Sequence, residues 1–212
     1  MPKAKICGLS TSETVTAALD HGAAFLGFMA FEKSPRYVSL DAAARLAAPA
    51  RGRALIVAVT VDPDDALVER ITAVLAPDFI QLHGRETPSR AHQVGERSGA
   101  GVIKVLPVSD ASDVDAASAF EGAVDHLMFE TKAAADADRP GGLGVPFDWT
   151  LLAGRRFARP WLLAGGLDPW NVGEALSISG APIADVSSGV ERGAGLKDPA
   201  LICAFLEAVR RA

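Results

Sequence analysis

The chain has 212 residues, 49% of them apolar, and a formal net charge of −5. This length suits one domain with a sizeable buried core. The acidic balance and the lack of a basic stripe argue against nucleic-acid binding, and no run approaches the ~18 consecutive apolar residues of a membrane span. The start of the chain lacks a signal peptide, and Cys7 and Cys203 make no disulfide framework, so we expect a cytoplasmic protein with reduced thiols.

Short apolar runs alternate with segments that carry helix-start signals along the whole chain. Strands are expected at residues 4–7, 24–28, 55–61, 79–82, 102–106, 126–129, 161–164 and 183–186. Several of these runs are continuously apolar, as is typical of strands that are covered on both faces. A last helix is expected to present Leu201, Phe205 and Val209 on one face.

Helix starts are signalled between the strands. Four pairs place a capping side chain before a proline: Asp62-Pro63, Thr87-Pro88, Asp168-Pro169 and Asp198-Pro199. Ser10 and Glu13 have the spacing of a capping box. Strict alternation predicts a parallel sheet, and eight units favour closure into an α/β (β/α)8 TIM barrel, a single domain over residues 1–212. The glycine-rich segment 131–147 is expected to be a lid or a disordered connection.

Two of the expected strands end in glycine turns. Residues 161–164 lead into Gly165-Gly166, and residues 183–186 lead into Ser187 and then Ser188-Gly189. Backbone N–H groups without side chains in front of them can cradle a phosphate. In a (β/α)8 barrel the loops after strands 7 and 8 are the usual phosphate site. Either turn alone would be ordinary, but the pair on consecutive strands predicts phosphate binding.

Cys7 stands at the end of the first strand, where such barrels carry their reactive groups. As a thiolate it can act as a base, and Lys5, on the same side of the strand, would favour that form. A small buried apolar side chain is an equally good interpretation of Cys7. Cys203 falls within the last helix and is expected to be structural.

Glu130 directly follows the sixth apolar run. A carboxyl group at the mouth of an apolar strand has a raised pKa and can serve as a general acid. A solvated or ion-paired carboxylate is the alternative, with Lys104 as a structural partner.

Three further polar residues are substrate-binding candidates. Arg36 can hold a carboxylate with two parallel hydrogen bonds, or lie exposed on the surface. His83 is either a base or a hydrogen-bonded wall residue, and Asp185 can hold a substrate N–H or cap local backbone. No His, Cys, Asp and Glu cluster has metal-ligand spacing, so no metal is expected.

Six segments in this order resemble the phosphoribosylanthranilate isomerase family of tryptophan biosynthesis. They are Lys5-Ile6-Cys7-Gly8, Lys33-Ser34-Pro35-Arg36, Gln81-Leu82-His83-Gly84, Phe147-Asp148-Trp149, Ala164-Gly165-Gly166-Leu167 and Asp185-Val186-Ser187-Ser188-Gly189-Val190-Glu191. Each segment is weak evidence by itself, but together they are highly specific and span the chain.

The resemblance implies an Amadori rearrangement of N-(5-phospho-β-D-ribosyl)anthranilate, a small phosphosugar, to the 1-deoxyribulose phosphate without any cofactor. It implies that Cys7 is the general base, that Arg36 holds the anthranilate carboxylate, and that Asp185 contacts the anthranilate amine. The phosphate would bind at Gly165, Gly166, Ser188 and Gly189. Family members occur as monomers and homodimers.

The chain departs from the family at the acid, which is normally an aspartate in a segment like Asp-Thr-Lys. Here the segment is Glu130-Thr131-Lys132. Three interpretations remain open. Glu130 is a working acid in a slightly recessed wall, or it is an impaired acid, or Asp136 or Asp138 takes its place. From the sequence alone we expect Glu130→Asp to keep or raise kcat/KM. The alternative function is a phosphosugar-binding barrel with impaired or lost catalysis. Met29-Ala30-Phe31-Glu32 is also atypical for the family, and nothing in the sequence explains it.

Overall fold

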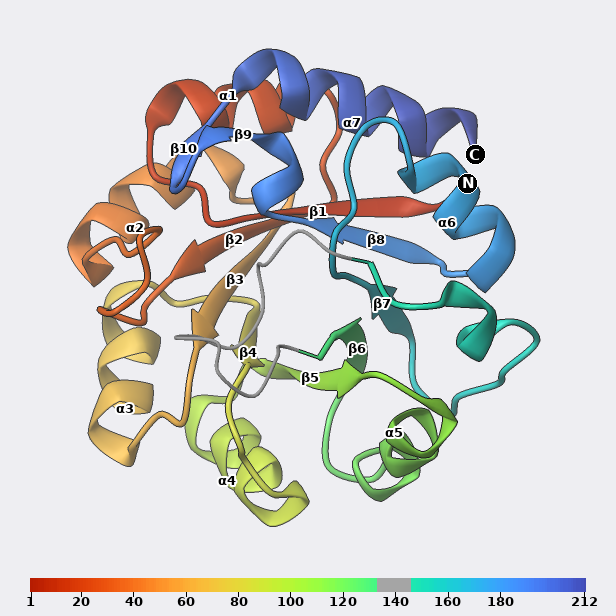
Figure 1. Cartoon of the computed structure of the whole chain (residues 1–212). Helices are drawn as coiled ribbons and strands as arrows, with labels where there is room; N and C mark the ends of the chain where they lie inside the picture. Colours follow the sequence, from red (N-terminus) through yellow and green to blue (C-terminus); the bar gives the residue numbers. More distant parts are fainter. Residues whose placement is uncertain (133–145) are drawn as a thin grey trace.

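A computed structural model describes residues 1–132 and 146–212 of the chain (Figure 1). Within these residues eight parallel strands close into a barrel in sequential order. They are β1 (Lys3–Cys7), β2 (Phe25–Met29), β3 (Leu55–Thr60), β4 (Phe79–Leu82), β5 (Gly101–Val108), β6 (His126–Thr131), β7 (Trp161–Leu163) and β8 (Ile183–Val186). The predicted (β/α)8 barrel is confirmed, and each predicted strand is found, with shifts of a few residues at its ends.

Helices surround the barrel, as Figure 1 shows in a view into its mouth. They are α1 (Ser12–Asp20), α2 (Leu40–Ala47), α3 (Asp65–Val74), α4 (Pro88–Ser98), α5 (Ala111–Asp115), α6 (Val172–Ser179) and α7 (Pro199–Arg211). Short 3₁₀ turns add η1 (Ala48–Ala50), η2 (Ala116–Ala119), η3 (Trp149–Leu152) and η4 (Ser188–Val190). A small hairpin, β9 (Glu191–Gly193) and β10 (Leu196–Lys197), lies between η4 and α7.

Two of the predicted helix caps are confirmed. The side chain of Thr87 accepts a hydrogen bond from the Arg90 N–H at the start of α4. The side chain of Asp198 accepts from the Ala200 N–H at the start of α7. In both helices a proline follows the cap and fits the first turn, where no N–H is needed.

Three predicted helix starts are wrong by one to three residues. The cap of α1 is Thr11 rather than Ser10, and the cap of α3 is Asp64 rather than Asp62. Asp62 instead has a φ of +45° and accepts a hydrogen bond from the Arg85 N–H. At α6 the N-cap position is Asn171, because Asp168 closes a separate turn by accepting from the Trp170 and Asn171 N–H groups.

The strands bury side chains on both faces, in two separate clusters. One cluster fills the inside of the barrel and includes Cys7, Val57, Val105 and Met128. The other lies between the strands and the helices. The barrel closes where β1 pairs with β8, with Lys5 opposite Asp185. Because side chains alternate along a strand, the inside positions carry the polar residues of the site described below.

None of the helices in residues 1–132 and 146–212 has the length and hydropathy needed to cross a membrane.

Candidate active site

Lys5 and Asp185 form a buried ion pair beneath Cys7. The Lys5 Nζ lies 2.7 Å from the Asp185 Oδ1, and the Lys5 side chain is fully buried. Burial by itself would lower the pKa of Lys5, but the charges of Asp185 and Cys7 raise it to about 12. The ammonium group therefore remains charged against the thiol. Asp185 is thus neither a backbone cap nor a free carboxylate in this structure.

Two opposing effects act on the pKa of the Cys7 thiol. Burial raises its pKa, whereas the Lys5 ammonium, which interacts with it directly, lowers the pKa. The effect of burial is the larger, and the pKa of Cys7 lies above its ordinary value. Lys5 lowers the pKa of Cys7, as the sequence predicted, but the net pKa is raised, so the resting thiol is protonated at neutral pH.

Glu130 contacts His83 at the mouth of the barrel, beside β5. The His83 Nε2 lies 2.8 Å from the Glu130 Oε2, and both side chains are largely buried. Burial alone would lower the pKa of His83, but the Glu130 carboxylate raises it overall. Glu130 lies within β6 rather than after it, because the strand continues to Thr131.

Lys104 is not the partner of Glu130, which corrects the expectation from the sequence. Its Nζ lies 2.6 Å from the Glu86 Oε2 and donates to the Gly84 carbonyl at 2.8 Å. Glu86 in turn accepts from the N–H groups of Gly84 and Asp62. This buried network fixes the turn directly after His83.

Arg36 is buried and held by Glu191. Its Nε and Nη2 atoms donate to the two oxygens of Glu191 at 2.7 and 2.9 Å. Lys197 also forms an ion pair with Glu191. Burial alone would raise the pKa of Glu191, but the hydrogen bond from Arg36 and the charge of Lys197 keep it below its ordinary value. Arg36 is therefore not the exposed surface arginine that was the alternative from sequence.

The Glu191 carboxylate occupies only one edge of the Arg36 guanidinium. Glu191 occupies the edge formed by Nε and Nη2, and in residues 1–132 and 146–212 no group accepts from Nη1. A planar guanidinium can hold a second carboxylate through Nη1 and Nη2. Its stem passes over Gly8, where a Cβ atom would lie 2.7 Å from the Arg36 Cδ, so the turn after Cys7 must be glycine.

The two glycine turns after β7 and β8 lie against each other. Gly165 and Gly166 have φ angles of +89° and +65°, which favour glycine. A Cβ atom on Gly189 would clash with the Leu167 carbonyl oxygen. Among the described residues, no group accepts from the backbone N–H groups of Gly165, Gly166, Ser188 and Gly189.

The structure brings the predicted reactive residues to one end of the barrel. The charges of Cys7 and Glu130 both act on Arg36, and the charges of Glu130 and His83 act on Asp185. These groups follow or belong to β1, β2, β4, β6 and β8, so they converge from most of the circumference. Asp136 and Asp138, the alternative acids, lie outside the described residues, as does most of the segment 131–147.

Two members of the site were given no role from the sequence. Glu191 stands in one of the matching segments, but its partner Arg36 is 155 residues away. Lys197, on the β9–β10 hairpin, is fully buried at its side chain and also donates to the Ser187 carbonyl. A buried lysine among charged neighbours gives no local sequence signal, because its partners come from the fold.

Comparison with known proteins gives matches over nearly the whole chain. The family profile of N-(5'-phosphoribosyl)anthranilate (PRA) isomerase matches residues 4–208. An N-(5'-phosphoribosyl)anthranilate isomerase of Caulobacter sp. (strain K31) is 64% identical over 212 residues and covers 100% of both chains.

Solved structures agree. A phosphoribosyl anthranilate isomerase crystallised with reduced 1-(o-carboxyphenylamino)-1-deoxyribulose 5-phosphate superposes with a TM-score of 0.86 at 29% identity. A structure of monomers obtained from the dimeric enzyme of Thermotoga maritima gives 0.85 at 29% identity, and both comparisons cover 100% of each chain. The alternative of lost catalysis finds no support here. The chain belongs to the phosphoribosylanthranilate isomerase family, whose members catalyse an isomerisation step of tryptophan biosynthesis.

Proposed function

We propose that Cys7 and Glu130 are the base and the acid of an Amadori rearrangement of N-(5-phosphoribosyl)anthranilate. Glu130 protonates the ribose ring oxygen with the proton that it shares with His83, which breaks the C1′–O bond and opens the ring to an imine. The Cys7 thiolate then removes the C2′ proton, and its electron pair forms the enolamine, which tautomerises to the ketone. The observation that carries this assignment is the convergence of the Cys7–Lys5–Asp185 and Glu130–His83 groups at one end of the barrel.

Cys7 needs assistance to work as a base, because its thiol is protonated at rest. Lys5 lies close to the sulfur and stabilises the thiolate once the proton has left. Asp185 binds Lys5 through Oδ1, and its second carboxylate oxygen would accept from the anthranilate amine. The same ion pair therefore serves the thiol on one side and the substrate on the other.

Arg36 and the glycine turns would hold the two anionic ends of the substrate. The open guanidinium edge of Arg36 suits the anthranilate carboxylate. The backbone N–H groups of Gly165, Gly166, Ser188 and Gly189 suit the phosphate, since they have no acceptor among the described residues. This placement leaves the ribose between Cys7 and Glu130.

His83 is a positioning residue for Glu130 in this scheme. A glutamate carries one methylene more than the family's aspartate, and its carboxyl group reaches the imidazole at 2.8 Å. The contact fixes a side chain that would otherwise sample several rotamers. The extra length is thus accommodated by a neighbour that fixes the position of the carboxyl group.

We propose a cytoplasmic location from the state of the two cysteines, and we treat the oligomeric state separately. Cys7 and Cys203 are both free thiols, which suits the reducing cytoplasm. We propose a monomer or a homodimer, and sedimentation velocity distinguishes the two.

The decisive experiment is Cys7→Ala, followed by the fluorescence of the anthranilate group during turnover. We expect turnover to vanish while binding of the reduced product analogue survives. Cys203→Ala is the matched control and should retain full activity, since that thiol lies on α7. Unchanged turnover in Cys7→Ala would remove Cys7 from the mechanism. Complementation of a tryptophan auxotroph by the unaltered chain tests the activity itself.

A further inference from the structure

Three potential metal ligands meet where the end of α1 contacts α7. The Cys203 Sγ lies 3.4 Å from the His21 Nδ1 and 3.5 Å from the Glu207 Oε1. All three donor atoms lie within 4.8 Å of one another. The sequence predicted no metal site because His21 and Cys203 are 182 residues apart, and only the closure of the barrel brings them together.

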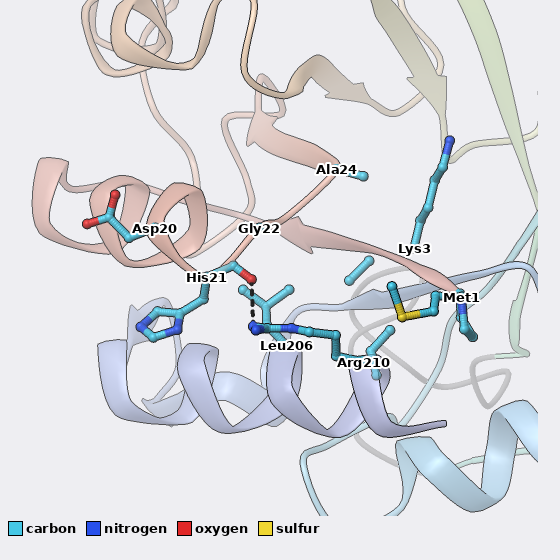
Figure 2. A pocket seen from close by; sticks show the side chains of 11 residues that line it. Met1, Lys3, Asp20, His21, Gly22, Ala24, Leu206 and Arg210 are labelled. Atoms are coloured by element: carbon cyan, nitrogen blue, oxygen red, sulfur yellow. Dashed lines mark hydrogen bonds between the residues drawn. The ribbon is translucent and has the colours of Figure 1, made fainter.

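Local structure fixes the direction of each ligand. Cys203 and Glu207 are four residues apart on α7, so they stand on the same face of that helix. His21 is the C-cap residue of α1, and its N–H bonds back to the Ala17 carbonyl. Its own carbonyl accepts from the Arg210 Nη2 at 3.1 Å. Figure 2 shows this contact, with the His21 imidazole lying over α7 and away from Met1 and Lys3.

The spacing matches a tetrahedral ion. Zinc binds a cysteine sulfur at about 2.3 Å and a histidine nitrogen or carboxylate oxygen at about 2.0–2.2 Å, which places such ligand atoms about 3.5 Å apart. We propose that His21, Cys203 and Glu207 bind a zinc ion, with water as the fourth ligand. The thiolate and the carboxylate balance its two positive charges. The sulfur and nitrogen donors disfavour magnesium and calcium, which prefer oxygen ligands.

The neighbouring cations leave the ligand atoms available. Arg211 Nη2 lies 3.8 Å from the Glu207 Oε2, the oxygen that does not face Cys203. The guanidinium of Arg210 is engaged by the His21 carbonyl rather than by the sulfur. Cys203 and His21 are partly buried and Glu207 is exposed, so an ion can enter from solvent and meet a partly shielded sulfur.

The place of the site predicts a structural role. His21 lies shortly before β2 begins, at the end of the barrel opposite to Cys7 and Glu130. An ion there ties α1 to α7, which lie side by side in Figure 1. Binding to the folded chain alone stabilises it, and at one hundred times the dissociation constant we expect the Tm to rise by about 5 °C or more. Turnover should not change.

Cobalt(II) is the probe, because a cobalt–thiolate bond gives a near-ultraviolet charge-transfer band. We expect one equivalent to bind to the full chain, with zinc displacing it. The band should disappear in Cys203→Ser and in His21→Ala and weaken in Glu207→Gln. It should persist in Cys7→Ser, which lacks the other thiol, and in His92→Ala, which removes an exposed histidine on α4.

Stability supplies the second readout. Without metal, Cys203→Ser should keep the turnover and the circular dichroism of the unaltered chain, which shows that it folds. With zinc, the unaltered chain and the Cys7→Ser and His92→Ala variants should gain fully in Tm, Glu207→Gln should gain less, and Cys203→Ser and His21→Ala should not gain. The proposal is overturned if no band forms at micromolar cobalt, or if the band depends on Cys7 rather than on Cys203.

Discussion

The Glu130 carboxyl group on β6 and the imidazole of His83, the residue directly after β4, lie 2.8 Å apart on either side of β5. The contact gives a reason for a glutamate at the position where the family resemblance leads us to expect an aspartate. A side chain shorter by one methylene would leave the imidazole without this partner.

Glu130→Asp should therefore lower kcat, contrary to the expectation from the sequence alone. The carboxyl group would withdraw from both His83 and the substrate, and a displacement of about 1 Å can cost on the order of a hundredfold in rate. Glu130→Gln should lose more, because it removes the acid, a contribution of about 10²–10⁴. Steady-state kinetics decide the order, with Glu96→Asp on the exposed face of α4 as the matched control. A faster Glu130→Asp enzyme would show that the His83 contact is not needed.

The rate should rise with pH in the alkaline direction. In the proposed mechanism the active form of Cys7 is the thiolate, and burial raises the pKa of the thiol above its ordinary value. The thiolate fraction is therefore small at neutral pH and increases as the pH approaches the raised pKa. We would measure kcat/KM against pH, and the rate of alkylation of Cys7 in a Cys203→Ser background. Both should rise over the same alkaline pH range. A rate already maximal at neutral pH would contradict a protonated resting thiol.

Arg36→Ala should mainly raise KM. The open edge of the guanidinium is assigned to the carboxylate of the substrate, and a hydrogen bond to a charged group contributes about 1.5–3 kcal/mol, roughly 10- to 100-fold in affinity. Glu191 keeps Lys197 as a partner in this variant, so the fold should survive. Arg53→Ala removes an exposed arginine and should change neither constant. A loss confined to kcat would argue against carboxylate binding by Arg36.

Lys5→Met should destabilise the fold by about 3–5 kcal/mol, because it leaves the buried Asp185 carboxylate without its partner. Replacing both members by apolar residues should restore much of the loss. Lys3→Met, two residues earlier on the same strand and exposed, should stay within about 0.5 kcal/mol. Urea unfolding followed by circular dichroism measures all three. Equal stability of the single and the double variant would show that the ion pair carries little of the energy.

The sequence predicted the barrel because each strand is an apolar run bounded by turn residues. Thr87 and Asp198 were recognised as caps because each is followed by a proline in a first helical turn. Asp62 and Asp168 carry the same signature but serve loops instead, since their carboxylates bind N–H groups outside the helix. A two-residue pattern does not say which N–H groups the fold will bring to a carboxylate.

The strand ends also identified most of the candidate site, since parallel strands place their last residues at one end of a barrel. The sequence could not show which groups are paired. Lys104 pairs with Glu86, and Glu130 pairs with His83. The register of β4, β5 and β6 determines both pairings. Which charged side chains pair between strands depends on interatomic distances in the folded barrel, and residue types alone do not reveal these distances.

Two buried cations of the site, Lys5 and Arg36, belong to the first part of the chain, and their counterions belong to the last. Lys5 and Asp185 are 180 residues apart in the sequence, and Arg36 and Glu191 are 155 residues apart. During synthesis on the ribosome both cations must therefore remain hydrated until the eighth strand and the hairpin after it emerge. A nascent chain of this protein becomes competent only in the final moments of translation, and a release a few dozen codons early would yield a catalytically silent fragment.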